Sequence, residues 1–546
     1  MRILVIGAVA AGTSAAAKAR RNNDQAEIVI YEKDNHISYS GCGLPYYIGG
    51  EIETLDELTP RNPGFFKKKY NIDVEVLHEV ISVDAEAKTI NVKNLQTGEI
   101  FTDHYDVLIV STGATPIVPP VEKIESDHVF FLRNVNSAKR IADYIQLKKP
   151  QHAVVVGTGF IGFEMLENLM HAGIQVTIVE RNEKITPNLD GDMARFLQTT
   201  LVKKGVNIKV SAEVLEIKND TVVLSTGEEI AAELIIMATG VRPNVSLATS
   251  FGVELGETGA IKVNEYMQTN IKDVYACGDC IETFSLITHK PVYRPLGSTA
   301  NKTGRIAGDV ATGGRLTYKG NLSTGIFKLF DLVVATTGLT ESEAIKEGYD
   351  IEVCHNIKPD KPAYFHGKEM VIKAIADKKS QKILGVQIVG YEGVDKRIDV
   401  FATLITYGAT VDELFHLDLA YAPPFSTTKD PVHYTGMILD NALNHNRPII
   451  TSVKLKELAT KTAVQIVDAR VSKQYDVAHV SDAVNMPHAT LREQMKDLDK
   501  NVPTITYCNK GVTGNAAQNI LLSHGFETVY NLSGGNKFYQ ASKKKK

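Results

Sequence analysis

The sequence predicts a multidomain α/β protein, and three features of the chain support this class. The segments RILVIGAVAAG (2–12) and HAVVVGTGFIG (152–162) each give a continuous apolar strand that ends in glycines and precedes a helix-like stretch. Apolar strands that alternate with helices are typical of parallel sheets covered on both faces. A further α/β unit begins with AVQIVDARVSKQYDVAHVSDAVNMP (463–487), and 546 residues suggest about three or four domains.

The composition excludes several classes of protein. Hydrophobic residues make up 43% and charged residues 23% of the chain, which is ordinary for a globular protein, and the net charge of −4 does not point to nucleic acid or to an anionic membrane. No apolar run approaches the length of a membrane span, and MRILVIGAVAAG is interpreted as a buried first strand rather than a signal peptide. The cysteines are too few and too scattered for a disulfide framework: Cys42, Cys277, Cys280, Cys354 and Cys508. We therefore expect a cytoplasmic protein with reduced thiols.

The two apolar segments are the start of an internal repeat. Each is followed by a second strand that ends in an acid, Glu32 in the first copy and Glu180 in the second. Later, HYDVLIVSTGATP (104–116) and AAELIIMATGVRP (231–243) each end an apolar strand in Thr-Gly. The repeat predicts two nucleotide-binding units, the second inserted within the first.

The rest of the chain has a different character. Residues 320–440 predict antiparallel strands followed by helices, and NHNRPII near 444–450 is interpreted as a linker. The small α/β unit then runs to about 540, and we expect the closing KKKK to be a solvated tail.

The second glycine loop predicts a dinucleotide site. A strand, a glycine-rich turn and a helix offer backbone N–H groups and the positive end of the helix to a pyrophosphate. GTGFIG has the full G-x-G-x-x-G spacing, with Glu180 placed for a ribose hydroxyl. Because Glu180 would repel a 2′-phosphate, we expect NADH, while Arg181 beside it leaves NADPH open. The predicted NADH-binding residues are Gly157, Gly159, Phe160, Ile161, Gly162, Glu180 and Gly240.

The first glycine loop is imperfect, because Val9 stands at the middle glycine position of GAVAAG. A tight turn without a ligand is the alternative. Two features favour FAD: Glu32 lies at the ribose-binding distance, and the apolar strand of TNIKDVYACGDC (269–280) leads into Gly278-Asp279, whose carboxylate would accept hydrogen bonds from a ribityl chain.

Taken together, the two nucleotide units, the two Thr-Gly crossings and the Gly-Asp motif resemble the two-dinucleotide-binding flavoprotein disulfide reductases over about residues 1–440. The resemblance implies a glutathione-reductase-like α/β flavoprotein fold, with an FAD-binding domain at 1–112 and 245–320, an NADH-binding domain at 113–244 and an α+β dimerisation domain at 321–443. The implied FAD-binding residues are Gly7, Ala8, Gly12, Glu32, Lys33, Thr112, Gly113, Gly278, Asp279 and Ala300.

Three of the cysteines are interpreted as packing residues. Cys277-x-x-Cys280 encloses the Gly-Asp pair already assigned to flavin, and no second cysteine pair exists for zinc. The same interpretation is extended to Cys354, and no metal site is expected.

Cys42 lies in SYSGCGLPYY (38–47), where no second cysteine is near enough for a local disulfide. A lone cysteine is usually a small buried hydrophobe. Here, however, Cys42 follows the Glu32 strand at the place where the resembled family has its flavin-facing thiol. We therefore expect a redox-active thiolate, with a pKa lowered beside the flavin.

Residue 10 separates two families that use a single cysteine. NADH peroxidases and oxidases carry a histidine in the first glycine loop and cycle through a sulfenic acid, whereas this chain has Ala10. GAVAAG, SYSGCGLPY, KRIDVFA and AYAPPFS instead resemble the coenzyme A disulfide reductases. That resemblance implies that Cys42 forms a mixed disulfide with coenzyme A (CoA).

The same resemblance implies further site residues. Tyr364 and Tyr421 match tyrosines that reach the active site of the partner subunit and orient or protonate the leaving thiolate, which implies a homodimer; packing at the dimer interface is the alternative. The implied CoA contacts are Ser14, Lys18, Arg21, Ser38 and Lys429. Lys18 and Arg21 suit phosphates, or simply form a solvated helix face.

The C-terminal unit, 450–541, resembles a single-domain rhodanese through IVDAR, AHVSDAVNMP, YCNKGVTG and VYNLSGG. Cys508 ends a strand and precedes a helix-like stretch, so loop amides and the helix end would stabilise its thiolate and a persulfide on it. An inactive domain is the alternative, and the retained Cys508, Gly511 and Gly514 favour activity. The loop carries Asn509, Lys510 and Thr513 rather than arginines, so we expect a persulfide donor rather than thiosulfate.

The two chemistries on one chain predict an FAD- and NAD(P)H-dependent reductase of CoA disulfide, CoA persulfide or polysulfide, in which Cys508 handles sulfane sulfur. The sequence does not rank these substrates. The alternatives are an NADH oxidase or peroxidase that cycles through a sulfenic acid on Cys42, and a non-enzymatic sulfur carrier. No nucleic-acid or membrane partner is expected.

Overall fold

The computed structural model describes residues 1–543, so of the KKKK tail only Lys543 lies within the described residues. The chain divides into two compact units, one formed by 1–181 with 211–321 and the other by 182–210 with the residues from 322 onward. Each unit is described by itself. No helix within residues 1–543 combines the length and the apolar character that a membrane crossing requires.

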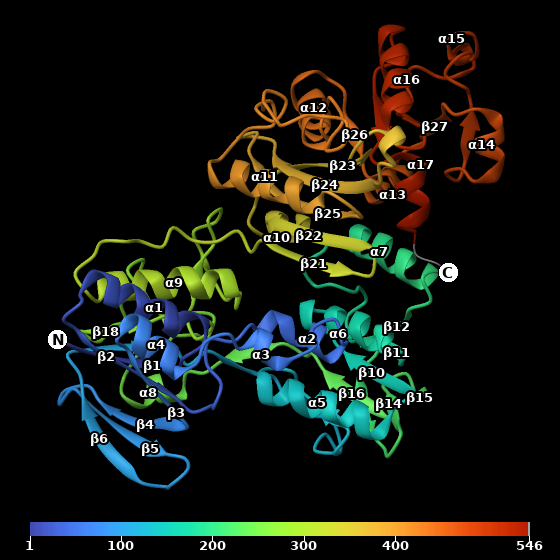
Figure 1. Ribbon diagram of the computed structural model, residues 1–546. Coiled ribbons are helices and arrows are strands. Elements are labelled where there is room, and N and C mark those ends of the chain that lie inside the picture. Colours follow the sequence, from blue (N-terminus) through green and yellow to red (C-terminus); the bar gives the residue numbers. More distant parts are fainter. Residues whose placement is uncertain (544–546) are drawn as a thin grey trace. The chain divides into compact units, whose positions relative to one another are not determined.

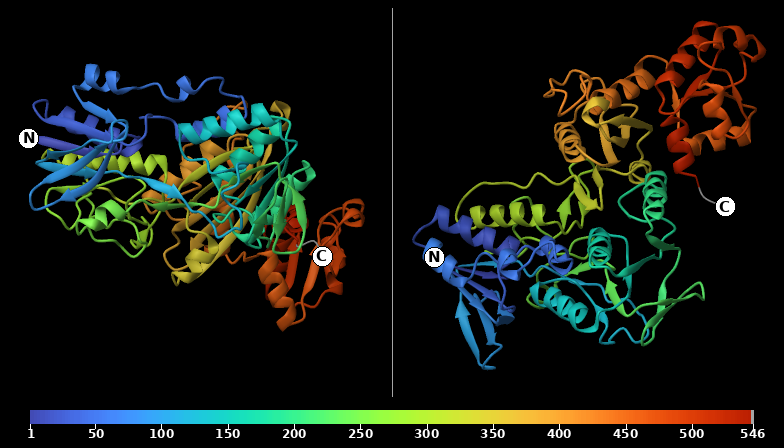
Figure 2. Two further views of the ribbon diagram at one scale, coloured as in Figure 1. Left: turned by 90° about the horizontal axis from the view of Figure 1, so that it is seen from below. Right: turned by 45° about the vertical axis from the view of Figure 1, so that its right-hand side comes forward.

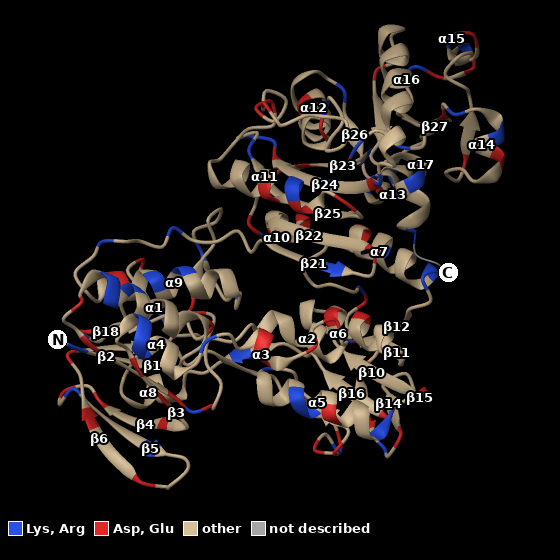
Figure 3. Ribbon diagram, in the orientation of Figure 1, with Lys and Arg blue, Asp and Glu red and all other residues tan. Residues whose placement is uncertain are grey.

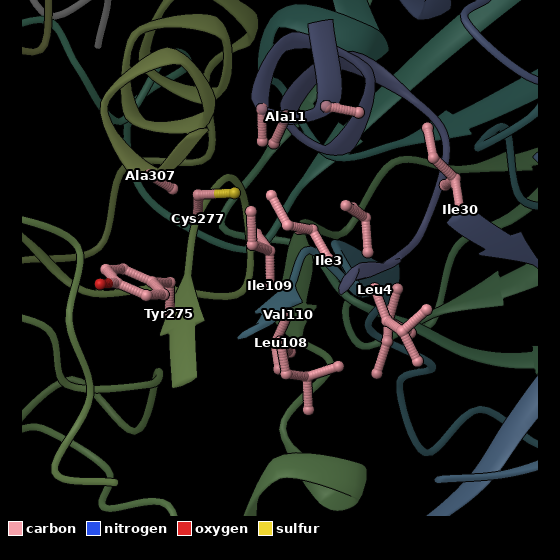
Figure 4. Close-up of a cluster of buried hydrophobic side chains, with 14 of the residues drawn as sticks. Ile3, Leu4, Ala11, Ile30, Leu108, Ile109, Val110, Tyr275, Cys277 and Ala307 are labelled. Atoms are coloured by element: carbon pink, nitrogen blue, oxygen red, sulfur yellow. The ribbon is translucent and has the colours of Figure 1, made fainter. Parts of the chain in front are cut away.

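A parallel five-stranded sheet with the order β18-β7-β1-β2-β3 organises the beginning of the first unit. Its strands are β1 (Arg2–Ile6), β2 (Glu27–Glu32), β3 (Asp73–Val76), β7 (Val107–Val110) and β18 (Val274–Ala276). Almost every residue of β1, β2 and β7 is buried, which explains their unbroken apolar sequences. Figure 4 shows side chains of β1, β2, β7 and β18 meeting in this core, with Ala11 and Ala307 from two helices at its edge.

Helices α1 (Ala10–Asn22) and α9 (Gly297–Val310) lie side by side in this unit (Figure 1). Small residues permit their close approach. A Cβ atom on Gly304 would lie 2.3 Å from the carbonyl oxygen of Ala11, and one on Gly308 would lie 2.1 Å from that of Ala15. The alanine-rich sequence of α1 is therefore a packing requirement as well as a helix-forming one.

The repeat predicted from the sequence is present as a second parallel sheet in the same unit, with the order β11-β10-β16-β9. Its strands are β9 (Val129–Phe130), β10 (His152–Val156), β11 (Gln175–Glu180) and β16 (Leu234–Met237). Helix α6 (Phe160–His171) follows β10, as α1 follows β1, and packs on β10 and β11.

Smaller elements complete the first unit. Two antiparallel three-stranded sheets are formed by β4 (His78–Asp84), β5 (Thr89–Asn94) and β6 (Ile100–His104), and by β13 (Val214–Ile217), β14 (Thr221–Leu224) and β15 (Glu229–Ala231). Two antiparallel pairs are β8 (Ala114–Pro116) with β17 (Val241–Pro243) and β19 (Thr283–Phe284) with β20 (Pro291–Val292). The remaining helices are η1 (Gly41–Gly43), α2 (Leu44–Ile48), α3 (Leu55–Leu58), α4 (Pro63–Tyr70), α5 (Val135–Lys148) and α8 (Ser246–Ser250).

The second unit contains the predicted antiparallel sheet, with the order β21-β22-β25-β24-β23. Its strands are β21 (Gly325–Leu329), β22 (Leu332–Gly338), β23 (Ile351–Pro359), β24 (Glu369–Asp377) and β25 (Ile383–Gly390). Helices α11 (Val394–Thr406) and α12 (Pro431–Asn444) pack on this sheet. The unit also holds α7 (Gly191–Lys203), β12 (Asn207–Val210), α10 (Glu341–Lys346) and η2 (Ala363–Phe365).

A parallel five-stranded sheet forms the C-terminal α/β domain of this second unit, with the order β26-β30-β29-β27-β28. Figure 2 shows this domain in orange to red. Its strands are β26 (Ile449–Ile450), β27 (Gln465–Asp468), β28 (Ala483–Asn485), β29 (Thr504–Tyr507) and β30 (Val529–Leu532). Its helices are α13 (Ser452–Lys461), α14 (Ser472–Val477), α15 (Leu491–Gln494), η3 (Met495–Asp497), α16 (Val512–Ser523) and α17 (Gly535–Ala541). The buried central strand β29 ends directly before Cys508.

Candidate active site

The first glycine loop is closely packed against its own strand and the neighbouring one. Gly7 has φ +102°, and a Cβ atom there would lie 2.4 Å from the carbonyl oxygen of Ser111; a Cβ on Gly12 would lie 1.9 Å from the oxygen of Gly7. Only glycine fits such positions. The buried carboxylate of Glu32 accepts a hydrogen bond from the amide of Ala8 at 2.7 Å, and burial raises the pKa of Glu32. Lys33, the next residue, is exposed.

The second loop repeats this geometry. Gly157 has φ +106° and a Cβ there would lie 2.4 Å from the oxygen of Ala238, while a Cβ on Gly162 would lie 2.1 Å from the oxygen of Gly157. The carboxylate of Glu180 accepts bonds from the amide and the hydroxyl of Thr158, at 3.2 and 2.6 Å. Gly159 is the N-cap of α6, which begins with Phe160 and Ile161, and a Cβ on Gly159 would meet open space. Gly240, after β16, adopts φ +96°. In each unit the carboxylate thus accepts a hydrogen bond from the residue after the first glycine of the loop: Glu32 from Ala8, and Glu180 from Thr158.

The Gly-Asp segment lies beside the first loop. Gly278 has φ +83°, and a Cβ there would lie 2.7 Å from the Cβ of Ala11 and 3.9 Å from that of Ala300, which is buried in α9. The carboxylate of Asp279 pairs with Arg133 at 3.2 Å, and its carbonyl accepts a bond from the hydroxyl of Tyr293 at 2.9 Å. The contact of Arg133 with Asp279 could not be predicted from the sequence, because only the folded chain brings the two residues together.

The Thr112-Gly113 segment after β7 is hydrogen-bonded to Asn244, which lies shortly after the second Thr-Gly segment. Thr112 donates its hydroxyl proton to the carbonyl of Asn244 at 2.7 Å, and the carbonyl of Gly113 accepts from the amide of Asn244 at 2.9 Å. These bonds join the segments that lead out of the two parallel sheets, consistent with the nested repeat.

Cys42 is a solvent-exposed thiol in η1, so it is not a buried packing residue. The following helix α2 packs on α5 and α6; a Cβ on Gly49, the residue that ends it, would lie 2.2 Å from the side-chain oxygen of Asn168. The lowered thiol pKa that we expect beside the flavin stays a prediction, and the protein's own groups act in the opposite direction. Partial burial, followed by the carboxylates of Glu164 and Asp279, raises the pKa of Cys42.

Glu164 on α6 is a site residue that the sequence did not reveal. Burial, and then the neighbouring Glu167, raise its pKa to about 7. It acts on Cys42 only because α2 packs on α6, and no spacing along the chain predicts that contact. Cys42 therefore has a neighbour whose charge changes near neutral pH.

The predicted CoA residues of the first unit lie on or beside α1. Ser14 donates to Asn301 at 2.7 Å, Lys18 pairs with Asp309 at 3.0 Å, and Arg21 is exposed. The amide of Ser38 donates to the carbonyl of Ala8 at 2.8 Å, which brings this residue next to the first glycine loop. Figure 3 shows Lys and Arg residues gathered on α1 and α9. Lys18 already has a carboxylate partner, and Arg21 is the more available cation for a phosphate.

The predicted tyrosines and Lys429 belong to the second unit. The side chains of Tyr364 and Tyr421 are 69% and 48% exposed, which is unusual for aromatic rings and leaves them available for contact with another chain. Lys429 is exposed before the N-terminus of α12.

Cys508 lies directly after β29, in a loop that presents the backbone amide of Gly511 to its sulfur. The amide of Gly511 donates to Sγ of Cys508 at 3.2 Å, and Gly511 adopts φ +102°. A Cβ on Gly514 would lie 2.9 Å from the Cα of Tyr507, and the carbonyl of Cys508 accepts from the amide of Asn536 at 2.8 Å. The sulfur is nearly buried, and this setting suits a thiolate or a persulfide.

The packing interpretation of the other three cysteines is confirmed. Cys277 and Cys280 are fully buried in the core of the first parallel sheet, and Cys354 is fully buried on β23. Burial raises the pKa of Cys280 to about 11 and that of Cys354 to about 12, so both thiols stay protonated at neutral pH.

The site combines two glycine-loop units that have acids at equivalent positions, a Gly-Asp segment beside the first loop, and an exposed thiol. Together these features define a two-dinucleotide-binding oxidoreductase. Comparison with known families gives the particular family. Residues 1–294 match the model for pyridine nucleotide-disulphide oxidoreductase, 325–431 match its dimerisation domain and 451–542 match the rhodanese-like domain. The chain belongs to the pyridine nucleotide-disulphide oxidoreductase family and carries a rhodanese-like domain.

Individual proteins extend this comparison. The NAD(P)H sulfur oxidoreductase (CoA-dependent) of Pyrococcus furiosus is 37% identical over 443 residues, which are 80% of this chain and 99% of that one. The crystal structure of reduced CoADR-RHD from Bacillus anthracis has a TM-score of 0.97 at 38% identity and covers 99% of this chain and 98% of its own. The NAD-dependent persulfide reductase of A. fulgidus has a TM-score of 0.92 at 36% identity, covering 99% and 100%.

The predicted fold class is confirmed, and the family implies FAD and NAD(P)H as cofactors. The residues present fit both groups. The glycines at the strand ends leave no room for a Cβ atom and expose the turns that a pyrophosphate requires, and a carboxylate ends the second strand of each unit.

Proposed function

We propose that this chain uses NAD(P)H to reduce CoA disulfide, CoA persulfide or polysulfide through Cys42, while its rhodanese-like domain handles sulfane sulfur on Cys508. The names of the relatives support this proposal, since they describe CoA-dependent sulfur reduction and persulfide reduction. The observation that carries it is the isolation of Cys42. This thiol is exposed and free, and the other four cysteines are buried and free. A disulfide at Cys42 therefore requires a sulfur from outside the chain.

The residues of the first unit have the following proposed roles. Gly7, Ala8, Gly12, Glu32, Lys33, Thr112, Gly113, Gly278, Asp279 and Ala300 hold FAD, and Gly157, Gly159, Phe160, Ile161, Gly162, Glu180 and Gly240 hold the pyridine nucleotide. The carboxylate of Glu180 favours NADH over NADPH. Ser14, Lys18, Arg21 and Ser38 contact CoA, and a contact of Lys429 with CoA stays a prediction from the family resemblance.

The chemistry at Cys42 is a thiol–disulfide exchange. Its thiolate attacks one sulfur of CoA disulfide, a Cys42–S–S–CoA bond forms, and one CoA thiolate leaves. With a CoA persulfide the same attack on the CoA sulfur expels hydrosulfide. When bound, FAD together with NAD(P)H supplies the electron pair that reduces the mixed disulfide back to two thiolates. Tyr364 and Tyr421 orient or protonate the leaving thiolate.

The exposed tyrosines and the dimerisation domain support a homodimer, in which these rings approach the partner's site. Cytoplasmic localisation stays a prediction.

On the rhodanese-like domain, the Cys508 thiolate attacks the outer sulfur of a persulfide R–S–SH. A bond forms between the two sulfurs, and the S–S bond of the donor breaks. The thiolate RS⁻ departs, and Cys508 then carries a persulfide. The amide of Gly511 stabilises the negative charge on this sulfur.

The experiment is anaerobic oxidation of NADH by the purified protein with CoA disulfide, CoA persulfide or polysulfide as acceptor. We expect turnover with at least one of these acceptors, and its loss in Cys42→Ser, with Cys354→Ser as the control for a buried thiol. NADH oxidation that needs oxygen and produces no thiol would support the oxidase alternative instead.

A further inference from the structure

The loop of residues 508–514, here called the persulfide loop, lies near strand β23 of the dimerisation domain. The backbone amide of His355 donates to Oγ of Ser533 at 2.6 Å, and its ring Nδ1 lies 3.0 Å from the same oxygen. Ser533 leads into Gly534 and Gly535, and a Cβ on Gly535 would lie 2.4 Å from the carbonyl oxygen of Cys508. These buried contacts hold β23 next to the segment that supports Cys508.

Lysines gather where β23 meets this loop. Lys358, three residues beyond His355, is half-buried with its Nζ 3.6 Å from the centre of the Tyr434 ring, and Nζ of Lys429 lies 5.9 Å from the same ring. From the rhodanese-like side, Lys510 and Lys537 both form ion pairs with Glu369. Glu369 is the cross-strand partner of Pro359, the neighbour of Lys358.

The positive charge in this cluster is not balanced. Lys510 and Lys537 share the carboxylate of Glu369, and within residues 1–543 no carboxylate lies at salt-bridge distance from Lys358 or Lys429. Burial, followed by the charge of Lys510, lowers the pKa of Lys358; a negative Cys508 opposes this, and Lys429 adds to it. A half-buried cation among like charges is unfavourable alone, and an anion among these lysines would relieve the repulsion.

We propose that Lys358, Lys429 and Lys510 form an anion-binding site beside Cys508 that holds the negative charge of a sulfane-sulfur donor. The inference rests on the proposed sulfur-transfer role of Cys508. The ligand class is an anionic sulfane-sulfur compound, either inorganic thiosulfate or the persulfide of a phosphate-bearing thiol. Lys358 and Lys429 of the dimerisation domain thereby add positive charge to that of Lys510, because the loop has no arginine. Thiosulfate is therefore a better candidate than the loop sequence alone indicates.

The charge of the site can be measured without turnover. Cys508 is alkylated in the full-length protein with iodoacetate, an anion, and with iodoacetamide, a neutral reagent of similar size, and both rates are followed by peptide mapping. The rate with iodoacetate divided by the rate with iodoacetamide reports the electrostatic potential at the sulfur. Access to the sulfur and its reactivity affect both reagents alike and therefore cancel in this ratio. We expect Lys358→Gln to lower the ratio by about threefold at low ionic strength, and less at high salt. Lys510→Gln should act in the same direction.

The controls separate charge from folding. Lys358→Arg should restore the ratio, and Lys473→Gln on the exposed helix α14 should leave it unchanged. Equal ratios in the native protein, K358Q and K510Q would overturn the proposal. Because alkylation needs no substrate, that result is distinct from failure of the proposed function, which would appear as a native protein that forms no persulfide on Cys508 from any donor.

The source of the anion is then tested with two donors. Rates of persulfide formation on Cys508 are compared for thiosulfate and for CoA persulfide, with an uncharged alkyl persulfide as reference. Selective slowing of thiosulfate in K358Q would assign the site to the inorganic dianion. Selective slowing of CoA persulfide would assign it to the phosphates. Equal slowing of all three donors would contradict an anion site.

Discussion

Asp192 and Lys373 form a buried ion pair, with Nζ of Lys373 2.9 Å from one carboxylate oxygen of Asp192. The other oxygen lies 2.8 Å from Nε2 of His355, whose opposite ring nitrogen contacts Ser533. The pair thus connects α7, the antiparallel sheet and the rhodanese-like domain within the second unit. His355 and Ser533 connect the pair to the segment in which Gly535 packs on the carbonyl of Cys508.

Asp192→Asn should destabilise the second unit by about 3 kcal/mol, near the lower end of the range for breaking a buried pair. The remaining partners Asp190 and Glu341, at 3.2 and 2.7 Å, still neutralise Lys373 and limit the loss. Urea unfolding followed by proteolysis of this unit measures the effect. Asp331→Asn removes an exposed partner of Lys204 and should change the midpoint little.

The same pair predicts how stability depends on pH. Burial by itself would raise the pKa of Asp192, but Lys373 and His355 lower it well below the usual range. A lowered pKa in the folded state stabilises the protein above the unfolded value of about 4, and that contribution is lost as the pH falls further. The urea midpoint of the native protein should therefore drop below about pH 4 more steeply than that of D192N. Parallel curves would contradict this assignment.

Gly12→Ala should abolish FAD retention. The new Cβ would lie 1.9 Å from the carbonyl oxygen of Gly7, so the first loop must move. Flavin absorbance per chain of the purified protein measures the loss, which we expect to exceed about tenfold. Gly64→Ala on α4, where the nearest atom is a side-chain oxygen at 3.4 Å, is the matched control and should retain flavin. Full flavin content in G12A would mean that this loop does not hold the cofactor.

Glu164→Gln should lower the pKa of Cys42. The charge of Glu164, which develops as the pH rises through about 7, contributes to the raised pKa of the thiol. After a thiol reductant has released any CoA and been removed, alkylation of Cys42 by iodoacetamide at pH 8 should become about two- to fivefold faster in the variant. Glu51→Gln removes an exposed acid that is not among the groups acting on Cys42, and it should react like the native protein. Unchanged kinetics in E164Q would show that the carboxylate does not influence this sulfur.

Gly511→Ala should impair sulfur transfer at Cys508. At φ +102° an alanine is strained by about 1–2 kcal/mol, and relaxation would move the amide away from Sγ. We expect persulfide formation on Cys508 to slow by about tenfold. Gly525→Ala imposes similar strain at φ +85° in a turn that does not touch Cys508, and should leave the rate unchanged.

Much of this architecture follows from the sequence, because local patterns encode it. The apolar strands, the glycine turns and the acids Glu32 and Glu180 are determined within short segments, and the structure has them where the spacing predicts. Features that depend on tertiary packing were not predictable in this way. The Arg133–Asp279 pair and the influence of Glu164 on Cys42 join residues from different elements.

The pKa of Cys42 illustrates the difference most clearly. Its position after the Glu32 strand predicts a redox role for the residue, but the effect of the protein's own carboxylates on its pKa could not be predicted from the sequence. Partial burial and the carboxylates of Glu164 and Asp279 raise this pKa, and both carboxylates belong to elements distant in sequence from Cys42. The lysines around Cys508 are a second case, since Lys358 and Lys429 come from another domain.

The most direct test of the central claim is the intact mass of freshly purified protein under denaturing, non-reducing conditions, followed by peptide mapping of Cys42. The proposed function predicts a single adduct of the mass of CoA on Cys42, released by a thiol reductant and absent from Cys42→Ser. Added oxygen on Cys42, with no CoA bound to any cysteine, would contradict it and favour the oxidase or peroxidase alternative.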